Sequence, residues 1–262
     1  HGWIQVYARD AQEALDLALM AYRIAEDPRV ATPVMVNLDG FALTHTYEQV
    51  HVPTQEAADA FLPPYATANR FDFEHPVNIG YSAGPAYNRY YKYRAHEDMC
   101  GALSVIDQVE AEFAATFGRT YTGAIEPYAC EDADFILVSL GTIAGLAEEV
   151  VRELRAEGVK AGSVRIRYMR PFPYEALCEV LSGAACVGVL EKDISFGAEG
   201  TVFTNVNSAL QRAGVSVPTR NFVGGLGGDD ISREDMHGIF SSLQKVAEGG
   251  VVSPVSFLRV ED

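Results

Sequence analysis

The segment that most constrains the fold is the run Val164–Pro173, VRIRYMRPFP. Apolar residues alternate with Arg165, Arg167 and Met169 in this run, at the two-residue period that is typical of a β-strand. The following Arg-Pro-Phe-Pro ends the strand, because proline has no N–H to give a sheet and restricts the residue before it. We therefore predict that residues 164–168 form an interior strand around which the neighbouring units are built.

Strand-like and helix-like segments alternate through the second half of the chain. We predict strands at residues 135–140, 164–168, 186–190 and 219–223, and helices at residues 143–157, 174–181, 200–213 and 233–247. Ser232 caps the last helix, and Asp235 lies at the position of a capping box. Strands that alternate with such helices imply right-handed crossovers, so the predicted fold class is α/β with a mainly parallel sheet.

The first half of the chain has a less regular pattern. Residues 11–25 predict a buried helix, and residues 33–38 predict a short strand that turns at Asp39-Gly40. Since one strand cannot form a sheet, we expect the rest of that sheet to come from upstream residues or from a partner. Further on we predict a short helix at residues 57–62 capped by Thr54, an extended connector at 66–85, and a long helix at 88–117 ended by Gly118.

Composition excludes several classes of protein. With 262 residues, 48% hydrophobic, the chain is long enough for one large or two modest domains. The net charge of −16 argues against nucleic acid as the main partner. No apolar run approaches the roughly 20 residues of a membrane helix, and no signal peptide pattern follows His1. The four cysteines lack a C-x-x-C spacing, so we expect reduced cysteines of a cytoplasmic protein and no metal site.

Three loops that follow predicted strands are candidates for ligand binding, because ligands of open α/β sheets collect at the carboxyl ends of strands. Residues 141–145 form a glycine-rich turn before a helix, which can hold an anion, but tight packing is the favoured interpretation. Residues 191–193 are charged, and a solvated loop is favoured over a ligand contact. Residues 224–230, GGLGGDD, favour a structural or interface role.

A fourth candidate is the loop at residues 39–46, DGFALTHT. Histidine side chains can gain and lose a proton near neutral pH, so His45 could shuttle a proton or donate to a substrate, with Thr44 and Thr46 orienting it. A histidine that is hydrogen-bonded to its own loop is at least as well supported. No pattern in the chain fixes a reaction class.

Six motifs in a fixed order resemble one family over nearly the whole chain. They are Gly2-Trp3-Ile4-Gln5 with Gln12–Asp16; Pro33–Val36 with Asp39-Gly40-Phe41 and His45; Phe61–Tyr65; Gly118-Arg119 with Tyr121; Arg170–Pro173; and Gly224–Gly228 with Asp230-Ile231. In this order they resemble the alpha subunit of pyruvate:ferredoxin oxidoreductase and its 2-oxoacid relatives, and the chain resembles an N-terminally truncated form of that subunit.

The resemblance implies two domains. Residues 1–115 would be the latter part of a pyrimidine-type thiamine diphosphate domain with its connector and long helix, and residues 118–262 a transketolase C-terminal-like domain. Family alpha chains are longer at the start, and the family's thiamine-activating glutamate and its substrate-binding threonine and arginine would lie upstream of His1. No catalytic or cofactor-binding residue is therefore assigned, while Asp39, Phe41, Thr44 and His45 are expected to line the active cleft.

The resemblance also implies an activity, namely oxidative decarboxylation of a 2-oxoacid, most simply pyruvate, with coenzyme A to give acetyl-CoA and CO2. The cofactors would be thiamine diphosphate with Mg, shared with a partner subunit, and iron–sulfur clusters on other subunits of beta, gamma and delta type. Ferredoxin or flavodoxin would take the electrons. Other substrates (oxalate, a branched-chain or aryl 2-oxoacid, 2-oxoglutarate) stay open, as does a non-catalytic assembly module; a nucleotide-binding domain is disfavoured because the fingerprint is absent.

Overall fold

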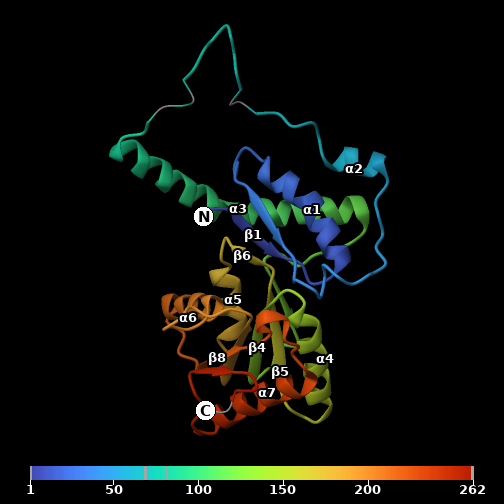
Figure 1. Cartoon of the computed structure of the whole chain (residues 1–262), viewed down its shortest axis with the longest axis vertical. Helices are drawn as coiled ribbons and strands as arrows, with labels where there is room; N and C mark the ends of the chain where they lie inside the picture. The colour runs from blue at the N-terminus through green and yellow to red at the C-terminus, as the bar shows by residue number, and fades with distance from the viewer. Residues whose placement is uncertain (1, 68–69, 79, 81, 261–262) are drawn as a thin grey trace.

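Two β-sheets lie one above the other along the long axis of the molecule (Figure 1). The computed structural model describes residues 2–67, 70–78, 80 and 82–260. The upper sheet has three strands in the order β2-β1-β6, and the lower sheet has six in the order β3-β5-β4-β7-β8-β9. None of the helices in the described residues is long and apolar enough to cross a membrane.

The lower sheet is the mainly parallel α/β sheet that the sequence predicts. Its strands are β3 (Ile125–Tyr128), β4 (Phe135–Leu140), β5 (Ala161–Ile166), β7 (Cys186–Glu191), β8 (Thr219–Val223) and β9 (Val255–Phe257). All neighbouring pairs are parallel except β3 with β5. The predicted strands at 135–140 and 219–223 are confirmed to the residue, and the strand at 186–190 runs one residue further. The short strands β3 and β9 were not predicted.

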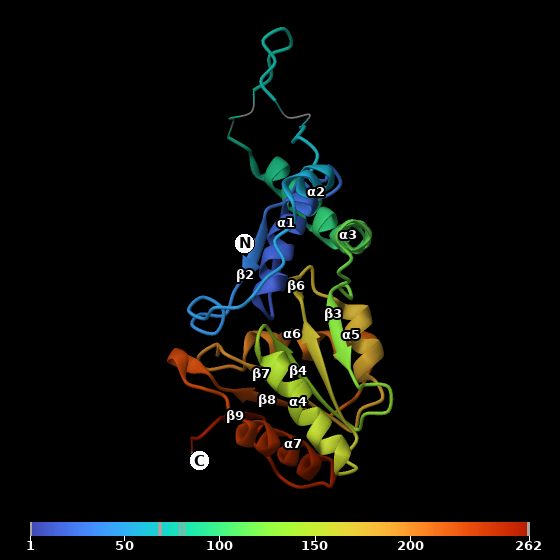
Figure 2. The ribbon, with the colours of Figure 1, turned by 90° about the vertical axis from the view of Figure 1, so that its right-hand side faces the viewer.

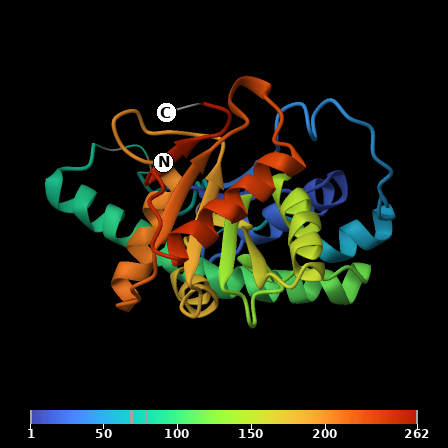
Figure 3. The same ribbon diagram turned by 90° about the horizontal axis from the view of Figure 1, so that it is seen from below.

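Helices cover both faces of the lower sheet (Figure 2 and Figure 3). They are α4 (Ile143–Ala156), α5 (Tyr174–Leu181), α6 (Thr201–Ala213) and α7 (Arg233–Ala247). Leu137 of β4 packs in the core with α4 and α7, whereas its neighbours Ile136 and Val138 pack with α5 and α6. Strands buried on both faces are typical of a parallel sheet between helix layers. The capping box predicted for the last helix is present at Ser232 and Asp235.

The upper sheet corrects the expectation of an isolated strand. β2 (Val34–Asn37) pairs in parallel with β1 (Ile4–Tyr7), a strand that the sequence analysis missed. β1 pairs on its other side, antiparallel, with β6 (Tyr168–Arg170) from the second half of the chain. The chain itself therefore supplies three strands here. The predicted strand at 164–168 is in fact split between β5 and β6, which belong to different sheets.

Three helices accompany the upper sheet: α1 (Ala11–Ala25), α2 (Gln55–Phe61) and α3 (Pro85–Phe117). Ile4 and Val6 of β1 share one core with α1, with the second half of α3 and with Tyr168 of β6. Thr54 caps α2 and Gly118 ends α3 with a positive φ of 70°, as predicted. The helix predicted at 88–117 begins earlier, at Pro85. Within the predicted connector, residues 68–69, 79 and 81 lie outside the described residues.

A buried group of charged side chains joins the two sheets. Glu13 of α1 accepts hydrogen bonds from the guanidinium groups of Arg165, at 2.8 and 3.0 Å, and of Arg167, at 2.8 Å. Arg167 also donates to Glu110 of α3 at 2.6 Å, and Arg165 donates to Glu126 of β3 at 2.7 Å. Glu13, Arg165 and Arg167 are at most 2% exposed. Burial alone would raise the pKa of Glu13, but the two arginines reverse this effect and hold it below its usual range.

We expect Glu13→Gln to destabilise the chain by about 3 kcal/mol or more, because it leaves two buried guanidinium groups without their shared carboxylate. Urea unfolding followed by circular dichroism measures the change. A suitable control is Asp98→Asn, which removes the exposed pair of Asp98 with Arg94 on α3 and should cost at most about 0.5 kcal/mol. Equal losses in the two variants would contradict the importance assigned to the buried group.

Candidate functional site

The loops that follow β2, β4, β7 and β8 meet where the two sheets face each other. Asp39, just after β2, accepts a hydrogen bond from the backbone N–H of Thr142 at 2.9 Å and another from the Thr142 hydroxyl. Its second carboxylate oxygen lies 3.5 Å from the ammonium nitrogen of Lys192, in the loop after β7. Asp39 thus ties three of the four loops that the sequence analysis selected.

Phe41 connects the fourth loop to this group. A β-carbon on Gly228 would lie 3.9 Å from its ring, so the loop after β2 lies beside the glycine-rich loop after β8. Gly141 is required at the same junction, because it has a φ of 59° and a β-carbon there would lie 2.8 Å from Asp39. This close approach supports the packing role favoured for residues 141–145.

A cavity of about 290 Å³ lies beside Asp39, between the two sheets. Its wall combines residues of the upper sheet with the carboxyl ends of β4 and β7, and includes Tyr7, Asp39, Arg170, Glu191, Lys192 and Asp193. Burial raises the pKa of Tyr7, and the nearby carboxylate of Asp193 adds to this effect. Two cationic and three acidic side chains therefore surround one small space, which could bind a polar ligand by paired hydrogen bonds.

Glu191 is the buried carboxylate of this cavity, at 2% exposure. It accepts hydrogen bonds from the backbone N–H groups of Val202 and Phe203, at 2.7 and 3.1 Å, and from the side-chain amide of Asn221 at 2.8 Å. It thereby caps α6, whose N-cap residue Gly200 has no side chain to do so. Burial raises the pKa of Glu191 to about 7, with Asp193 contributing. The predicted solvated loop at residues 191–193 is therefore wrong for Glu191.

The four residues predicted to line a cleft all lie in the loop after β2. Only Asp39 among them borders the cavity. The Thr44 hydroxyl accepts from the Phe41 backbone N–H at 3.0 Å and lies 2.8 Å from Nδ1 of His45. The rings of Phe41 and His45 stack with centroids 4.7 Å apart, and both side chains are exposed. This is the geometry of the alternative in which His45 is hydrogen-bonded to its own loop. A role of these residues in binding stays a prediction.

Tyr7 and Arg170 were missed as site residues. Tyr7 is the last residue of β1, a strand that the sequence analysis did not recognise. Its position at the end of a strand could therefore not be predicted. Arg170 was noted only as part of the proline-rich stop after the strand. Its position at the end of β6, which belongs to the upper sheet, is what brings it to the cavity.

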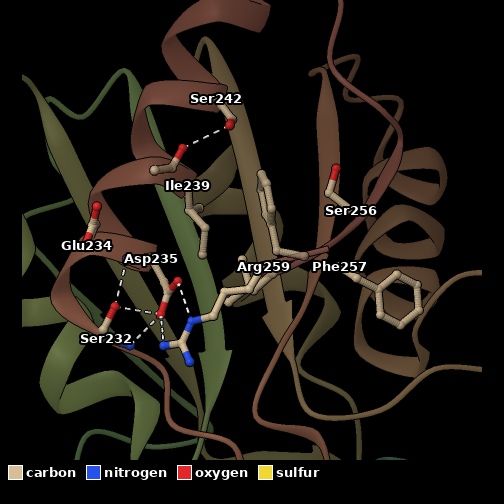
Figure 4. Close-up of a pocket in the computed structure, with 11 residues that line it drawn as sticks. Ser232, Glu234, Asp235, Ile239, Ser242, Ser256, Phe257 and Arg259 are labelled. Carbon is tan, nitrogen blue, oxygen red and sulfur yellow. Dashed lines mark hydrogen bonds and ion pairs between the residues drawn. The ribbon is translucent and has the colours of Figure 1, made fainter. Parts of the chain in front are cut away.

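A larger hollow of about 660 Å³ lies elsewhere, between α7 and the C-terminal strand β9 (Figure 4). Three of its polar side chains are bonded to one another: Arg259 donates to Asp235 at 2.6 Å, and Asp235 accepts from Ser232 in the capping box. The Arg259 guanidinium, with Ser232, holds the pKa of Asp235 at about 2. These contacts attach the C-terminal segment to α7, and this attachment accounts for the groove.

Comparisons with known proteins match this architecture. Residues 1–111 match the family model described as pyruvate flavodoxin/ferredoxin oxidoreductase, thiamine diphosphate-binding, and residues 133–236 match pyruvate:ferredoxin oxidoreductase core domain II. The pyruvate synthase subunit PorA of Pyrococcus furiosus is 40% identical over 98% of this chain. The ketoisovalerate oxidoreductase subunit VorA of Pyrococcus horikoshii is 40% identical over 95% of it. The chain spans 65% of the length of the first relative and 63% of the second.

One solved structure supports the fold. The 2-oxoglutarate:ferredoxin oxidoreductase from Magnetococcus marinus, determined with 2-oxoglutarate, coenzyme A and succinyl-CoA bound, aligns with 94% of this chain and 42% of its own. The TM-score is 0.55 and the sequence identity is 17%. The likeness therefore concerns the path of the backbone.

We expect Glu191 to make the stability of the chain depend on pH near neutrality. Its folded-state pKa of about 7 lies above the ordinary 4.5, so the folded chain binds a proton more tightly than the unfolded chain between these values. The stabilisation by the bound proton is therefore lost as pH rises through that range, by about 3 kcal/mol in total.

Urea unfolding of the wild type and of Glu191→Gln at several pH values between 5 and 8 tests this (about one half-unit apart suffices). The difference in unfolding free energy, wild type minus variant, should fall steadily as pH rises. Glu199→Gln, at an exposed position after the same strand, serves as the control and should show a constant difference. A constant difference for Glu191→Gln as well would disprove the raised pKa.

Proposed function

This chain belongs to the pyruvate:ferredoxin oxidoreductase family, and we propose from that premise that it works as part of the alpha-type subunit of a pyruvate oxidoreductase. The reaction converts pyruvate and coenzyme A into acetyl-CoA, CO2 and one proton, and passes two electrons to ferredoxin. The observation that carries the proposal is the pair of family matches in the family's order, on a fold in which Asp39 joins three of the four ligand-side loops.

A branched-chain 2-oxoacid is the second candidate substrate. The relative named ketoisovalerate oxidoreductase subunit VorA has the same 40% identity as the pyruvate synthase subunit. Pyruvate is preferred because pyruvate synthase subunits from several organisms share about this level of similarity with the chain. Oxalate, an aryl 2-oxoacid and 2-oxoglutarate are less well supported, as is an assembly module without chemistry.

Thiamine diphosphate would supply the carbanion chemistry of this reaction when bound. Its diphosphate usually requires a Mg ion held by carboxylates and phosphates. No group of three or more metal-ligating side chains occurs within the part of the chain that the structure describes. The buried carboxylate of the cavity, Glu191, is already bonded to α6 and Asn221. The described residues therefore do not fit a complete site for the cofactor, and we derive no step through it.

We propose that thiamine diphosphate and Mg are held jointly with other parts of the enzyme, and that iron–sulfur clusters lie on other subunits. Partner subunits and ferredoxin, or flavodoxin, complete the electron path, and we propose a cytoplasmic location. Division of the chain near residues 115–118 into a pyrimidine-type domain and a transketolase C-terminal-like domain also remains our proposal.

This chain's own contribution is to position the loops at the edge of the active cleft. Asp39 fixes the loop after β2 against Thr142 and Lys192, so Phe41, Thr44 and His45 of the same loop are held relative to the lower sheet. The Thr44 hydroxyl lies 2.8 Å from Nδ1 of His45, and we propose that the other ring nitrogen of His45 contacts a ligand.

The activity is tested by 2-oxoacid-dependent reduction of a viologen dye, using the chain co-purified with its partner subunits. Pyruvate, 2-ketoisovalerate and 2-oxoglutarate are each supplied with and without coenzyme A. We expect the highest kcat/KM with pyruvate and dependence on coenzyme A. A preference for 2-ketoisovalerate would keep the chain in the family and assign it a branched-chain substrate. If no 2-oxoacid supports dye reduction, the result would favour the assembly module.

We expect His45→Ala to lower turnover by about tenfold or more in the assembled enzyme, because it removes the proposed proton-transfer group of the loop after β2. Subunit composition, measured by size-exclusion chromatography, should not change. His51→Ala is the matched control, since His51 is an exposed histidine of the same segment and lies outside the loop at residues 39–46. Equal activity of both variants would show that the loop is only structural.

A further inference from the structure

Three polar side chains project from one face of the upper sheet into the cavity between the sheets. Ile4 and Val6 of β1 point to the opposite face, where they share a core with α1 and α3. Because side chains alternate along a strand, Gln5 and Tyr7 point away from these helices. Arg170 of β6 is the cross-strand neighbour of Gln5. Gln5, Tyr7 and Arg170 all line the cavity.

These three side chains keep unused hydrogen-bonding groups. Within the described residues, the side chains of Gln5 and Tyr7 have no hydrogen-bond partner, and Arg170 donates only through Nη1, to a backbone oxygen. No carboxylate in the described part of the chain pairs with Arg170, whereas the nearby Arg165 and Arg167 both bind Glu13. The free Nε and Nη2 of Arg170 form the pair of donors that binds both oxygens of a carboxylate.

The lower side of the cavity has the opposite character, since two carboxylates there lack a cation. Burial raises the pKa of Glu191, and the neighbouring Asp193 raises it further. Lys192 lies between them in sequence, but its ammonium nitrogen is 3.5 Å from Asp39. Among the residues that the structure describes, no cation forms an ion pair with Glu191 or Asp193. A positively charged group beside Asp193 would be favoured, because it offsets the repulsion between the two carboxylates.

Apolar side chains complete the wall of the cavity: Leu140, Ile143, Met169 and Leu190. The volume of about 290 Å³ is just under the roughly 300–1,000 Å³ that is typical of small-molecule pockets. A matching ligand is therefore small, with an anionic end for the upper sheet, a cationic group for the lower sheet and an apolar body.

We propose that this cavity binds a small α-amino acid with an apolar side chain, such as valine, between the two sheets. Arg170 binds its carboxylate together with Tyr7 and Gln5, Asp193 binds its ammonium group, and the apolar wall contacts its side chain. This inference goes beyond the proposed reaction, in which an amino acid is neither substrate nor product. Binding can be measured without turnover, so its test is independent of the test of the activity.

Isothermal titration calorimetry of the assembled enzyme with L-valine tests the proposal. We expect saturable binding to one site in each copy of this chain. Isovalerate lacks the ammonium group and isobutylamine lacks the carboxylate, so each should bind at least tenfold more weakly than L-valine. Arg170→Gln and Asp193→Asn should each weaken L-valine binding at least tenfold, because each removes one charged partner of the ligand.

Tyr7→Phe is a milder variant that keeps the fold testable, because it removes only a hydroxyl group without a partner in the described residues. It should weaken L-valine binding about threefold or more, by the loss of one hydrogen bond. Thermal unfolding without ligand, measured for each variant, shows whether the fold is retained.

Two exposed residues outside the cavity provide matched controls. Arg152→Gln on α4 and Glu199→Gln in the loop after β7 remove the same kinds of charge and should leave L-valine binding unchanged. No binding of L-valine, or binding that the Arg170, Asp193 and Tyr7 variants leave unchanged, would overturn the proposal. Equal affinity for isovalerate and L-valine would also overturn it, because the ligand would then be a simple carboxylate.

Discussion

The carboxylate of Glu13 binds two guanidinium groups in a region without solvent, and the relation of the two sheets depends on this contact. Arg165 belongs to the lower sheet and Arg167 stands between the sheets, while Glu13 belongs to α1 beside the upper sheet. Buried charges are tolerated only when each is paired, so a shift of one sheet against the other would leave charges unpaired. The ion pairs therefore stabilise one arrangement of the two sheets. This arrangement in turn determines the shape of the cavity between them.

In the candidate site, too, carboxylates hold separate segments of the chain together. Asp39 joins backbone and side-chain donors from separate loops, and Glu191 replaces a missing cap at α6. Both carboxylates organise loops that are otherwise rich in glycine and would have many conformations. His45 therefore lies on a loop that Asp39 supports, which is the condition for the binding role that we propose for it.

Sequence patterns predicted the elements whose stability is local. The last helix has its own capping box, and the strand at 135–140 is an almost continuous apolar run between turns, so their bounds followed from nearby residues. The strands β1, β3, β6 and β9 have three or four residues each and exist because of the strands they pair with. Arg167 and Glu191 carry charges, which argue for solvent until their buried partners are known. Tyr7 and Arg170 were missed for the same reason, since their positions depend on pairing across about 160 residues.

The antiparallel strand β6 gives the chain a topology in which neither half is self-contained. A fragment that ended at Gly118 would keep Glu13, Glu110 and strands β1 and β2, but it would lose Tyr168 from its core and both arginines that neutralise its buried carboxylates. A fragment that began at Gly118 would keep both arginines, but their side chains would then face water instead of the buried carboxylates. The boundary between the two sheets is thus a boundary in space and not in the chain, so we expect the two sheets to unfold together.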